Sequence, residues 1–415
     1  MRFLLLAAYA AVVAVGYYLK FLNLRHLKAH GARIPAEFEG VIDGDLLRKS
    51  RDYTVENSRF GFLASGFSHL AAIVFLFGGL LQFYNAAILS FDYSFITAGV
   101  LFFLFLSYAS TLLSVPFDLY ATFKIEKKYG FNTMTPRLWV TDQVKSLMLS
   151  TVLLVILLAV AFWLVEASPR YWWLWLWGFF LAFGIFMMYI SPYVIEPLFN
   201  KYTPVDDPEL EEEIAQLMDK TGIRVSRVFK MDASKRSTHT NAYFTGIGRV
   251  KRIVLFDTLL EKLTQEEILA VLAHEAGHWK RRHLLKGIAL SQILALVGLY
   301  LTFQLTCSPM LTDLMGIEHP SFFAKLVIAG FLFSIIAFPL GPLTNLMSRR
   351  FEREADDFAC RLTDDPGSMA SSLVKLARDN LSNLHPHPWY AAFYYSHPPV
   401  VERIRRIRGF SSHAT

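Results

Sequence analysis

The sequence predicts a mainly α-helical membrane protein, with seven transmembrane helices and a small mixed α+β domain in the cytosol. The first observation behind this prediction is the composition: 54% of the 415 residues are hydrophobic and only 18% are charged. Soluble domains carry about a quarter charged residues, so this apolar excess requires a lipid environment. The second is that apolar runs of about 20 residues recur along the chain. The third is that most polar residues gather in two long segments.

Seven apolar runs are long enough to cross a bilayer as helices. They lie at roughly residues 3–19, 67–87, 94–114, 146–166, 171–193, 284–305 and 321–345. The first run resembles a signal peptide, because Arg2 precedes it and it contains an Ala8-Tyr9-Ala10 triplet. That triplet lies inside the apolar run rather than after it, which favours a retained span.

The distribution of Lys and Arg predicts the orientation. The loops at 20–60 and 115–145 carry eight and five of these residues, whereas the alternate loops carry only Arg170. By the positive-inside rule, the N-terminus lies outside and the C-terminus lies in the cytoplasm. The chain then divides into spans one to five with their loops (1–193), a cytosolic segment (194–283), spans six and seven (284–345) and a cytosolic C-terminal segment (346–415).

The cytosolic segments have the patterns of a small mixed domain. Residues 203–221 predict a capped, acidic, amphipathic helix, and the stretches RVFKMDAS and RIVLFDT predict short strands. The net charge of +6 does not indicate a nucleic-acid partner, because basic and acidic residues are interspersed and no nucleic-acid-binding motif accompanies them. We therefore expect this domain to be attached to helices that enter the lipid bilayer.

The stretch LTQEEILAVLAHEAGH carries the main chemical signal. Thr264 can cap a helix here, and Glu267 completes a capping box. His274 and His278 then lie one turn apart on the same face. Two imidazoles at this spacing can ligate one Zn²⁺, and Glu275 can act as general base toward a water activated by the metal. The alternative is a chance pair of histidines on a polar helix face.

A third ligand is expected from a separate helix. A metzincin would have Gly and His where this chain has Arg281 and Leu284, which excludes that variant. His283 is a weaker candidate that fits better at the membrane interface. The segment LMSRRFEREADDFACRL places Glu352 and Asp356 four residues apart on one helix. Glu352 would complete a site with an open fourth position, and Asp356 could accept a ring N–H from a ligating histidine. The alternative is a charged surface helix on which Glu352 pairs with a neighbouring arginine.

Beyond these residues, the chain resembles the type I CAAX prenyl proteases, a family of seven-span membrane zinc metalloproteases. The resemblance covers nearly the whole chain. It is carried by EKKYGFNTMT (126–135), EPLFNKYTP (196–204), SKRSTHTNAYFTG (234–246), RIVLFDTLLE (252–261), HEAGHW (274–279), SRRFEREADDFA (348–359) and YYSHPPVVERI (394–404). Several of these segments are long and unusual, so the ordered set is far more specific than an HExxH motif.

The resemblance implies one zinc ion per chain, held by His274, His278 and Glu352, with Glu275 as the catalytic base. This agrees with the ligand set expected from the spacing. The resemblance also implies that the seven helices surround an intramembrane chamber, and that the zinc site of the small cytosolic metalloprotease domain lies near its cytosolic end.

The resemblance assigns roles to three further residues. It implies that the NAYF segment is an edge strand that pairs with an extended substrate, which places Asn241 and Tyr243 at the cleft. It also implies that His397 faces the scissile carbonyl and helps to stabilise the developing oxyanion. Without the resemblance, His397 would be interpreted as a capping residue ahead of Pro398 and Pro399.

The function that follows is a zinc endopeptidase acting near the C-terminus of hydrophobic or prenylated (CAAX-type) peptide substrates. A quality-control protease for unlipidated, misfolded membrane proteins is the alternative. A transporter with a structural zinc ion is disfavoured, because the spans lack paired interrupted helices and buried ion pairs. The short loop at 306–320 and the C-terminal SSHAT, which has no KDEL-type or dilysine signal, favour a bacterial inner membrane over the endoplasmic reticulum. The oligomeric state is not indicated.

Overall fold

The computed structural model describes residues 2–245, 250–316 and 320–410. The C-terminal SSHAT and part of the loop at 306–320 lie outside the described residues. In the described part of the chain, seven helices are long and apolar enough to cross a bilayer, as predicted. The spans are Arg2–His30 (α1), Gly44–Phe77 (α2), Phe95–Tyr129 (α4, Phe95–Tyr120; η2, Ala121–Glu126; α5, Lys127–Tyr129), Pro136–Ala167 (α6), Trp172–Phe199 (α7, Trp172–Val194; α8, Glu196–Phe199), His283–Cys307 (α12) and Phe322–Thr363 (α14, Phe322–Ala337; η4, Phe338–Leu340; α15, Gly341–Thr363).

The predicted position of the second span is wrong. The sequence predicts a span at 67–87, but α2 ends at Phe77 and a separate helix, α3 (Leu80–Leu89), follows it. Gly78 and Gly79 separate the two helices, and Gly79 has a φ of 88°, which glycine adopts without a steric penalty. The span therefore lies in the 34-residue helix α2, which begins in polar sequence. At 1.5 Å per residue this helix is about 50 Å long, more than a bilayer core requires.

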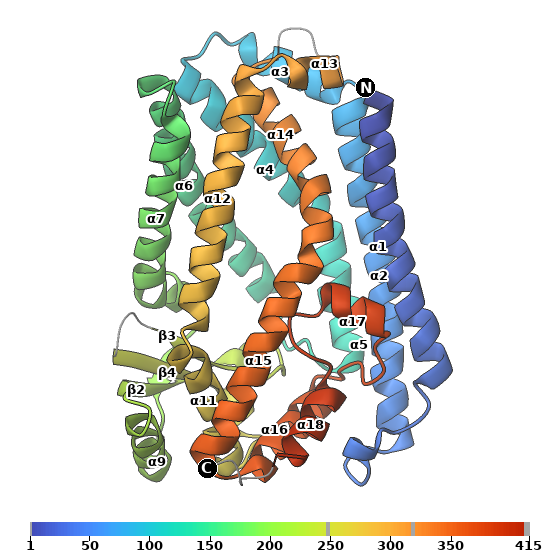
Figure 1. Ribbon diagram of the computed structural model, residues 1–415, viewed down its shortest axis with the longest axis vertical. Helices are drawn as coiled ribbons and strands as arrows, with labels where there is room; N and C mark the ends of the chain where they lie inside the picture. The colour runs from blue at the N-terminus through green and yellow to red at the C-terminus, as the bar shows by residue number, and fades with distance from the viewer. Residues whose placement is uncertain (1, 246–249, 317–319, 411–415) are drawn as a thin grey trace.

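The spans stand roughly parallel to the long axis of the molecule (Figure 1). Helices α1 and α2 lie along one side, and α6 and α7 lie along the opposite side. The sheet and helix α11 lie at the end opposite α3 and α13 (Met310–Met315). Large apolar side chains on the spans face outward; Leu112, for example, is 73% exposed. Such surfaces are stable only in lipid, which fits a multi-pass membrane protein. An enclosed chamber between the spans stays a prediction.

Four strands form one small sheet in the order β1-β2-β4-β3. They are β1 (Tyr202–Pro204), β2 (Arg224–Met231), β3 (Ala242–Thr245) and β4 (Val250–Phe256). Strands β2 and β4 pair in parallel, and the other two pairs are antiparallel. Within the described residues, β3 pairs with β4 alone, so the predicted edge strand is confirmed.

The helices of the domain that contains the sheet pack on one face of it. The remaining helical elements are η1 (Ala36–Phe38), α9 (Pro208–Asp219), η3 (Ala233–Lys235), α10 (Asp257–Leu260), α11 (Gln265–Lys280), α16 (Pro366–Asp379), α17 (Pro388–Tyr394) and α18 (Val400–Arg408). Ile253 and Leu255 of β4 belong to one buried apolar cluster with Leu272 of α11, Ile214 of α9 and Ile404 of α18. Burial of each such side chain contributes roughly 1.5–3 kcal/mol, so this cluster fixes α11 relative to the sheet.

Helix α15 continues directly from the seventh span. The run from Phe322 to Thr363 is helical throughout, with the short 3₁₀ turn η4 between α14 and α15. The division expected between residues 345 and 346 therefore falls inside a helix. As a result, one continuous rod connects the apolar span to the residues of SRRFEREADDFA, which pack in the domain that contains the sheet.

Candidate metal centre

Helix α11 begins with the capping box that the sequence predicts. The Thr264 side chain accepts a hydrogen bond from the Glu267 amide at 3.4 Å, and Glu267 accepts one from the Thr264 amide at 2.9 Å. Ser371 and Lys375 of α16 also donate to the Glu267 carboxylate, at 2.6 and 2.8 Å. The free backbone N–H groups at the start of α11 thus have acceptors, and Glu267 links this end of the helix to α16. These contacts fix the rotation of the helix that carries His274.

Helix α15 packs on α11 along small residues. Ala273 and Ala276 of α11 and Ala355 and Ala359 of α15 are completely buried. Small side chains at a helix crossing let the two backbones approach closely. The crossing brings the carboxylates of α15 to the imidazoles of α11.

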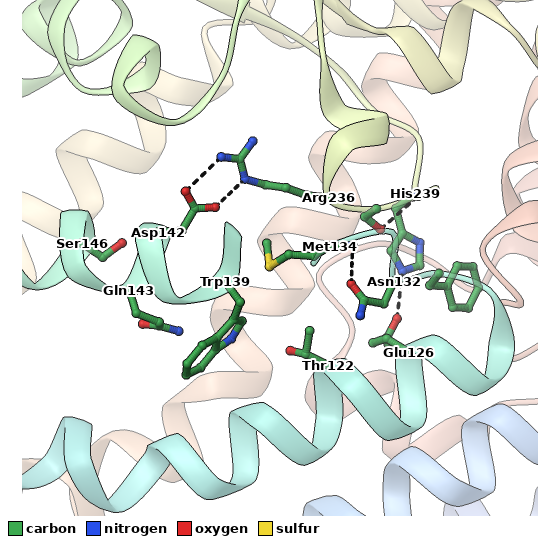
Figure 2. Close-up of a pocket in the computed structure, with 12 residues that line it drawn as sticks. Thr122, Glu126, Asn132, Met134, Trp139, Asp142, Gln143, Ser146, Arg236 and His239 are labelled. Carbon is green, nitrogen blue, oxygen red and sulfur yellow. Dashed lines mark hydrogen bonds and ion pairs between the residues drawn. The ribbon is translucent and has the colours of Figure 1, made fainter. Parts of the chain in front are cut away.

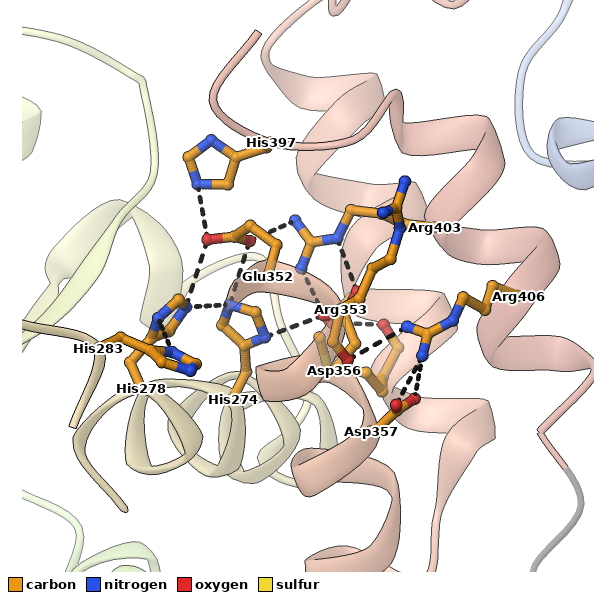
Figure 3. Close-up of polar contacts among 12 residues, drawn as sticks. His274, His278, His283, Glu352, Arg353, Asp356, Asp357, His397, Arg403 and Arg406 are labelled. Atoms are coloured by element: carbon orange, nitrogen blue, oxygen red, sulfur yellow. Dashed lines mark hydrogen bonds and ion pairs between the residues drawn. The ribbon is translucent and has the colours of Figure 1, made fainter. Parts of the chain in front are cut away.

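Three predicted ligands meet at this crossing (Figure 3). One ligand atom each from His274, His278 and Glu352 lies within 4.8 Å of the others. The Nε2 atoms of the two histidines are 3.2 Å apart. Glu352 places Oε2 3.5 Å from Nε2 of His274 and Oε1 3.3 Å from Nε2 of His278. His274 and Glu352 are buried, and His278 is half-buried.

The distance of 3.2 Å between the two Nε2 atoms is close to the spacing of ligand atoms around a zinc ion, and each Nε2 has one Glu352 oxygen beside it. Ligand atoms that lie about 2.0–2.2 Å from a tetrahedral zinc ion are separated from one another by about 3.3–3.6 Å. In addition, the buried Oε2 of Glu352 accepts no hydrogen bond from any described residue. Two ring nitrogens facing each other and a buried carboxylate oxygen without a donor are groups that a cation would satisfy.

Asp356 lies on the other side of His274. Its Oδ1 is 2.9 Å from the His274 Nδ1. Arg403 of α18 donates to both oxygens of Asp356, at 2.6 and 3.0 Å, and its Nη1 lies 3.4 Å from Glu352 Oε2. The expectation that Asp356 contacts a ligating histidine therefore agrees with the geometry, and Arg403 balances the charge of both carboxylates.

The carboxylates change the proton affinity of His274. Burial alone lowers the pKa of His274, but the neighbouring carboxylates of Asp356 and Glu352 outweigh this effect and raise the pKa to about 9. A cation that binds Nε2 must therefore displace a proton from His274 at neutral pH, so binding of the metal depends on pH.

The two predicted catalytic residues, Glu275 and His397, differ in their contacts. Glu275 is half-buried, and its carboxylate makes no hydrogen bond or ion pair with a described residue, so it is free to bind a water molecule. His397 lies in the connection between α17 and α18, with Nε2 3.2 Å from Oε1 of Glu352 and a side chain that is 61% exposed. Ser396 Oγ lies 3.0 Å from its Nδ1. Arg349 donates to the Tyr395 carbonyl at 2.6 Å, which holds this connection against α15.

The edge strand lies beside α11, but Tyr243 faces away from that helix. Ala242 packs into the core shared with α11, so Tyr243 faces the opposite side of the sheet. The Tyr243 hydroxyl donates to Glu196 of α8 at 3.0 Å. Burial and the hydrogen bond to Tyr202 raise the pKa of Tyr243, which keeps it a neutral donor. Asn241 is exposed just before the strand.

The segment that leads into β3 is tethered to the membrane helices around a cavity of about 490 Å³ (Figure 2). Arg236 binds both oxygens of Asp142 on α6, at 2.8 and 3.1 Å. His239 stacks on Phe131 with ring centroids 4.2 Å apart, and its Nε2 lies 3.5 Å from the Glu126 carboxylate. None of the predicted site residues lines this cavity. Its contacts fix the start of the edge strand.

Sequence reasoning missed the position of Arg403 and the contact of His283 with His278. Arg403 shares a helix face with Val400, Ile404 and Ile407, and a charged residue on a buried apolar stripe is the signal that could have found it. His283 is not a third ligand, because it lies behind His278 with the two Nδ1 atoms 3.1 Å apart. It is only 4% exposed, because Phe351 and Glu354 of α15 pack against it.

Comparisons with known proteins agree with this fold. The family profile described as "CAAX prenyl protease N-terminal, five membrane helices" matches residues 23–201, and "Peptidase family M48" matches residues 204–411. The CAAX prenyl protease 1 homolog of Oryza sativa subsp. japonica is 34% identical over 407 residues, which covers 94% of each chain. The metalloprotease YhfN of Bacillus subtilis is 33% identical and covers 74% of this chain and 72% of its own. The crystal structure of S. mikatae Ste24p has a TM-score of 0.90 at 29% identity and covers 98% of both chains.

Proposed function

The chain belongs to the CAAX prenyl proteases of peptidase family M48 and is a membrane metalloprotease, and from this premise we propose that it is a zinc endopeptidase. Its substrates are peptide bonds near the C-terminus of hydrophobic or prenylated proteins. The observation that carries this proposal is the meeting of His274, His278 and Glu352 within 4.8 Å of one another, and Glu275 follows His274 directly on the same helix.

Each residue of the centre has a task in this reaction. Zinc, when bound by His274, His278 and Glu352, polarises a carbonyl and makes water acidic near neutral pH. Glu275 takes the proton from the attacking water and returns it to the leaving amine. His397 donates a hydrogen bond from Nε2 to the carbonyl oxygen as negative charge develops on it. Ser396 supports this tautomer when its hydroxyl donates to the Nδ1 of His397.

The free edge of β3 supports recognition of an extended substrate. A strand that adds to this edge is held by main-chain hydrogen bonds, so varied side chains are tolerated. Asn241 lies where the substrate would meet the start of the strand. Tyr243 supports the strand through its bond to Glu196 rather than through the metal centre.

The same edge favours a second candidate, a protease that removes misfolded membrane proteins without lipid anchors. Main-chain recognition does not require a prenyl group. The test between the two candidates compares kcat/KM for a farnesylated C-terminal peptide with kcat/KM for a misfolded membrane protein. A higher kcat/KM for the unlipidated protein would select this candidate.

The proposed orientation follows from the basic loops. The N-terminus lies outside, and the metal centre and the C-terminus lie in the cytoplasm. Of the possible membranes, we propose a bacterial inner membrane. Labelling of single cysteines in intact cells with a membrane-impermeant maleimide tests the orientation: a cysteine at Ser308 should react, and one at Asp206 should not.

The first experiment measures zinc content and cleavage of a quenched fluorescent farnesyl-CAAX peptide by the detergent-purified protein. We expect about one zinc ion per chain, and a loss of cleavage of at least about 10²-fold in Glu275→Gln with zinc retained. Glu266→Gln is the matched control, because Glu266 is exposed on the same helix. Near-normal turnover in Glu275→Gln would refute the assignment of the base.

A further inference from the structure

His283 and Glu354 form a polar chain behind the metal centre. Helix α11 ends at Lys280 and α12 begins at His283, so the metal helix and the sixth span are joined by two residues. Arg282 has a φ of 56° and a ψ of 34°, a left-handed conformation that costs energy for a residue with a side chain. This reversal turns His283 back against α11, five residues after His278.

His283 lies beside His278, away from Glu352 (Figure 3). Its Nδ1 lies 3.1 Å from the Nδ1 of His278, and its Nε2 lies 3.2 Å from Oε2 of Glu354. The ring stacks on Phe351 of α15, with centroids 4.2 Å apart and an angle of 7° between the planes. The Arg350 Nε donates to the other oxygen of Glu354 at 3.1 Å. His283 therefore fills a fitted position between the two helices of the metal centre.

The direction of these hydrogen bonds is fixed from both ends. To ligate a metal through Nε2, His278 must carry its proton on Nδ1, and this N–H can only donate. The Nδ1 of His283 must then accept, which leaves the proton of His283 on Nε2. That N–H points at Glu354, whose ionised carboxylate can only accept. No other arrangement of protons satisfies all three residues and also leaves the metal-facing nitrogen of His278 free.

We propose that His283, supported by Glu354, is a positioning residue that fixes the ring orientation and the tautomer of His278. It has the role toward His278 that Asp356 has toward His274, since a ligating imidazole is oriented by the acceptor of its other N–H. The two ligating histidines are then held unequally: His274 by a buried carboxylate, and His278 by a neutral ring that passes the interaction to a half-exposed carboxylate. This inference rests on the proposed zinc centre.

Two substitutions at His283 separate hydrogen bonding from packing. His283→Phe keeps an aromatic ring on Phe351 but removes both nitrogens. His283→Gln removes the ring but keeps an acceptor for His278 and a donor for Glu354. If His283 acts through packing alone, the Phe variant should keep more of the zinc affinity. If it positions His278, the Gln variant should keep more. Glu354→Leu removes the final acceptor without changing His283.

The test uses the full-length protein in detergent and measures zinc affinity by competition with a chromophoric chelator. The visible spectrum of the Co²⁺-substituted protein reports the ligand geometry, and thermal unfolding of the chelated protein reports packing. We expect His283→Phe to weaken zinc binding by about 10–100-fold and to change the cobalt spectrum. Glu354→Leu should weaken zinc binding less than His283→Phe. The zinc affinity of His283→Gln should stay within about threefold of the wild type, because both hydrogen bonds are kept.

Unchanged zinc affinity and cobalt spectrum in His283→Phe would overturn the proposal, as would equal losses in the Phe and Gln variants. If His283→Phe does not fold, Glu354→Leu and His283→Gln decide by the same order of affinities. Failure of the proposed function gives a different result. If the wild-type protein binds zinc but cleaves no peptide, the zinc affinities of the variants still test the role of His283. Wild-type protein that binds no zinc overturns both.

Discussion

Gly277 and Ala355 touch where α11 crosses α15. A Cβ atom on Gly277 would lie 3.0 Å from the Cα and 3.2 Å from the carbonyl oxygen of Ala355, and 3.2 Å from Cβ of Phe358. These contacts are mostly with backbone, which cannot rotate away. The glycine within the HExxH motif therefore sets the distance between the helix of the two histidines and the helix of Glu352.

Gly277→Ala should force α11 and α15 apart. Overpacking of this kind costs about 1–3 kcal/mol of unfolding free energy, and the wider crossing should lower zinc affinity as well. Chelator competition and thermal unfolding measure the two effects. Gly298→Ala is the control, because a Cβ on Gly298 would meet no atom within 4 Å. Equal behaviour of the two variants would show that the crossing tolerates a methyl group.

Arg403→Met should destabilise the metal-free protein more than the zinc-loaded protein. The change leaves the buried carboxylates of Asp356 and Glu352 without their arginine, which costs about 3–5 kcal/mol for a broken buried pair. A bound dication restores part of the charge balance. Unfolding temperatures with zinc and with chelator measure this difference. Arg408→Met, at the exposed end of α18, should change neither temperature.

The stability of the chelated protein should fall as the pH rises from about 6.5 to about 9. The pKa of His274 is 6.5 in an unfolded chain and is raised to about 9 in the fold. A raised folded-state pKa stabilises the protein fully below the unfolded value, and this contribution is lost as the pH passes through the folded value. Thermal unfolding across this window measures the slope. Asp356→Asn should flatten it, and a rising slope in the wild type would contradict the assignment.

Zinc affinity should change with pH in the opposite direction. Because zinc must displace the proton on His274, affinity should increase from pH 6.5 towards 9 and then level off. Proton release on zinc binding, measured by calorimetry in buffers of different ionisation enthalpy, checks this. Zinc binding without proton uptake by the buffer at pH 7 would show that His274 is already neutral.

Asp142→Ala should impair substrate binding more than chemistry. It removes the partner of Arg236, and loss of a partly buried charged hydrogen bond costs about 1–3 kcal/mol. Because this pair tethers the segment leading to β3, KM should rise more than kcat falls. Steady-state kinetics separate the two constants. Gln143→Ala is the control, because Gln143 lines the same cavity but takes no part in that ion pair. This variant should leave both constants near the wild-type values.

Local features were predictable from the sequence because helix geometry fixes them. A spacing of four residues places His274 and His278 on one face wherever the helix lies, and the Thr264 capping box needs only residues three apart. Glu352 and Asp356 were found by the same spacing. Their joint placement at α11 depended on which helices cross; it was expected because the two histidines need a third ligand, and the ordered set of long motifs supported it.

Features that depend on backbone reversals were not predictable. The two glycines at 78 and 79 end the second span inside an apolar run, and hydropathy alone does not detect such a break. Arg282 adopts a left-handed conformation that its residue type does not indicate, so the return of His283 to His278 was missed. Arg403 is far from both motifs in sequence and joins them only through the packing of α18.

The continuous rod from Phe322 to Thr363 has a consequence for how this protein can vary in evolution. Glu352 lies in the same helical run as the seventh span. One inserted or deleted residue between Phe322 and Glu352 would rotate the carboxylate by about 100° and shift it by about 1.5 Å along the axis. Substitutions in this span are therefore tolerated as long as they remain apolar, whereas changes in its length are not. We expect length polymorphism in related chains to be confined to the loops.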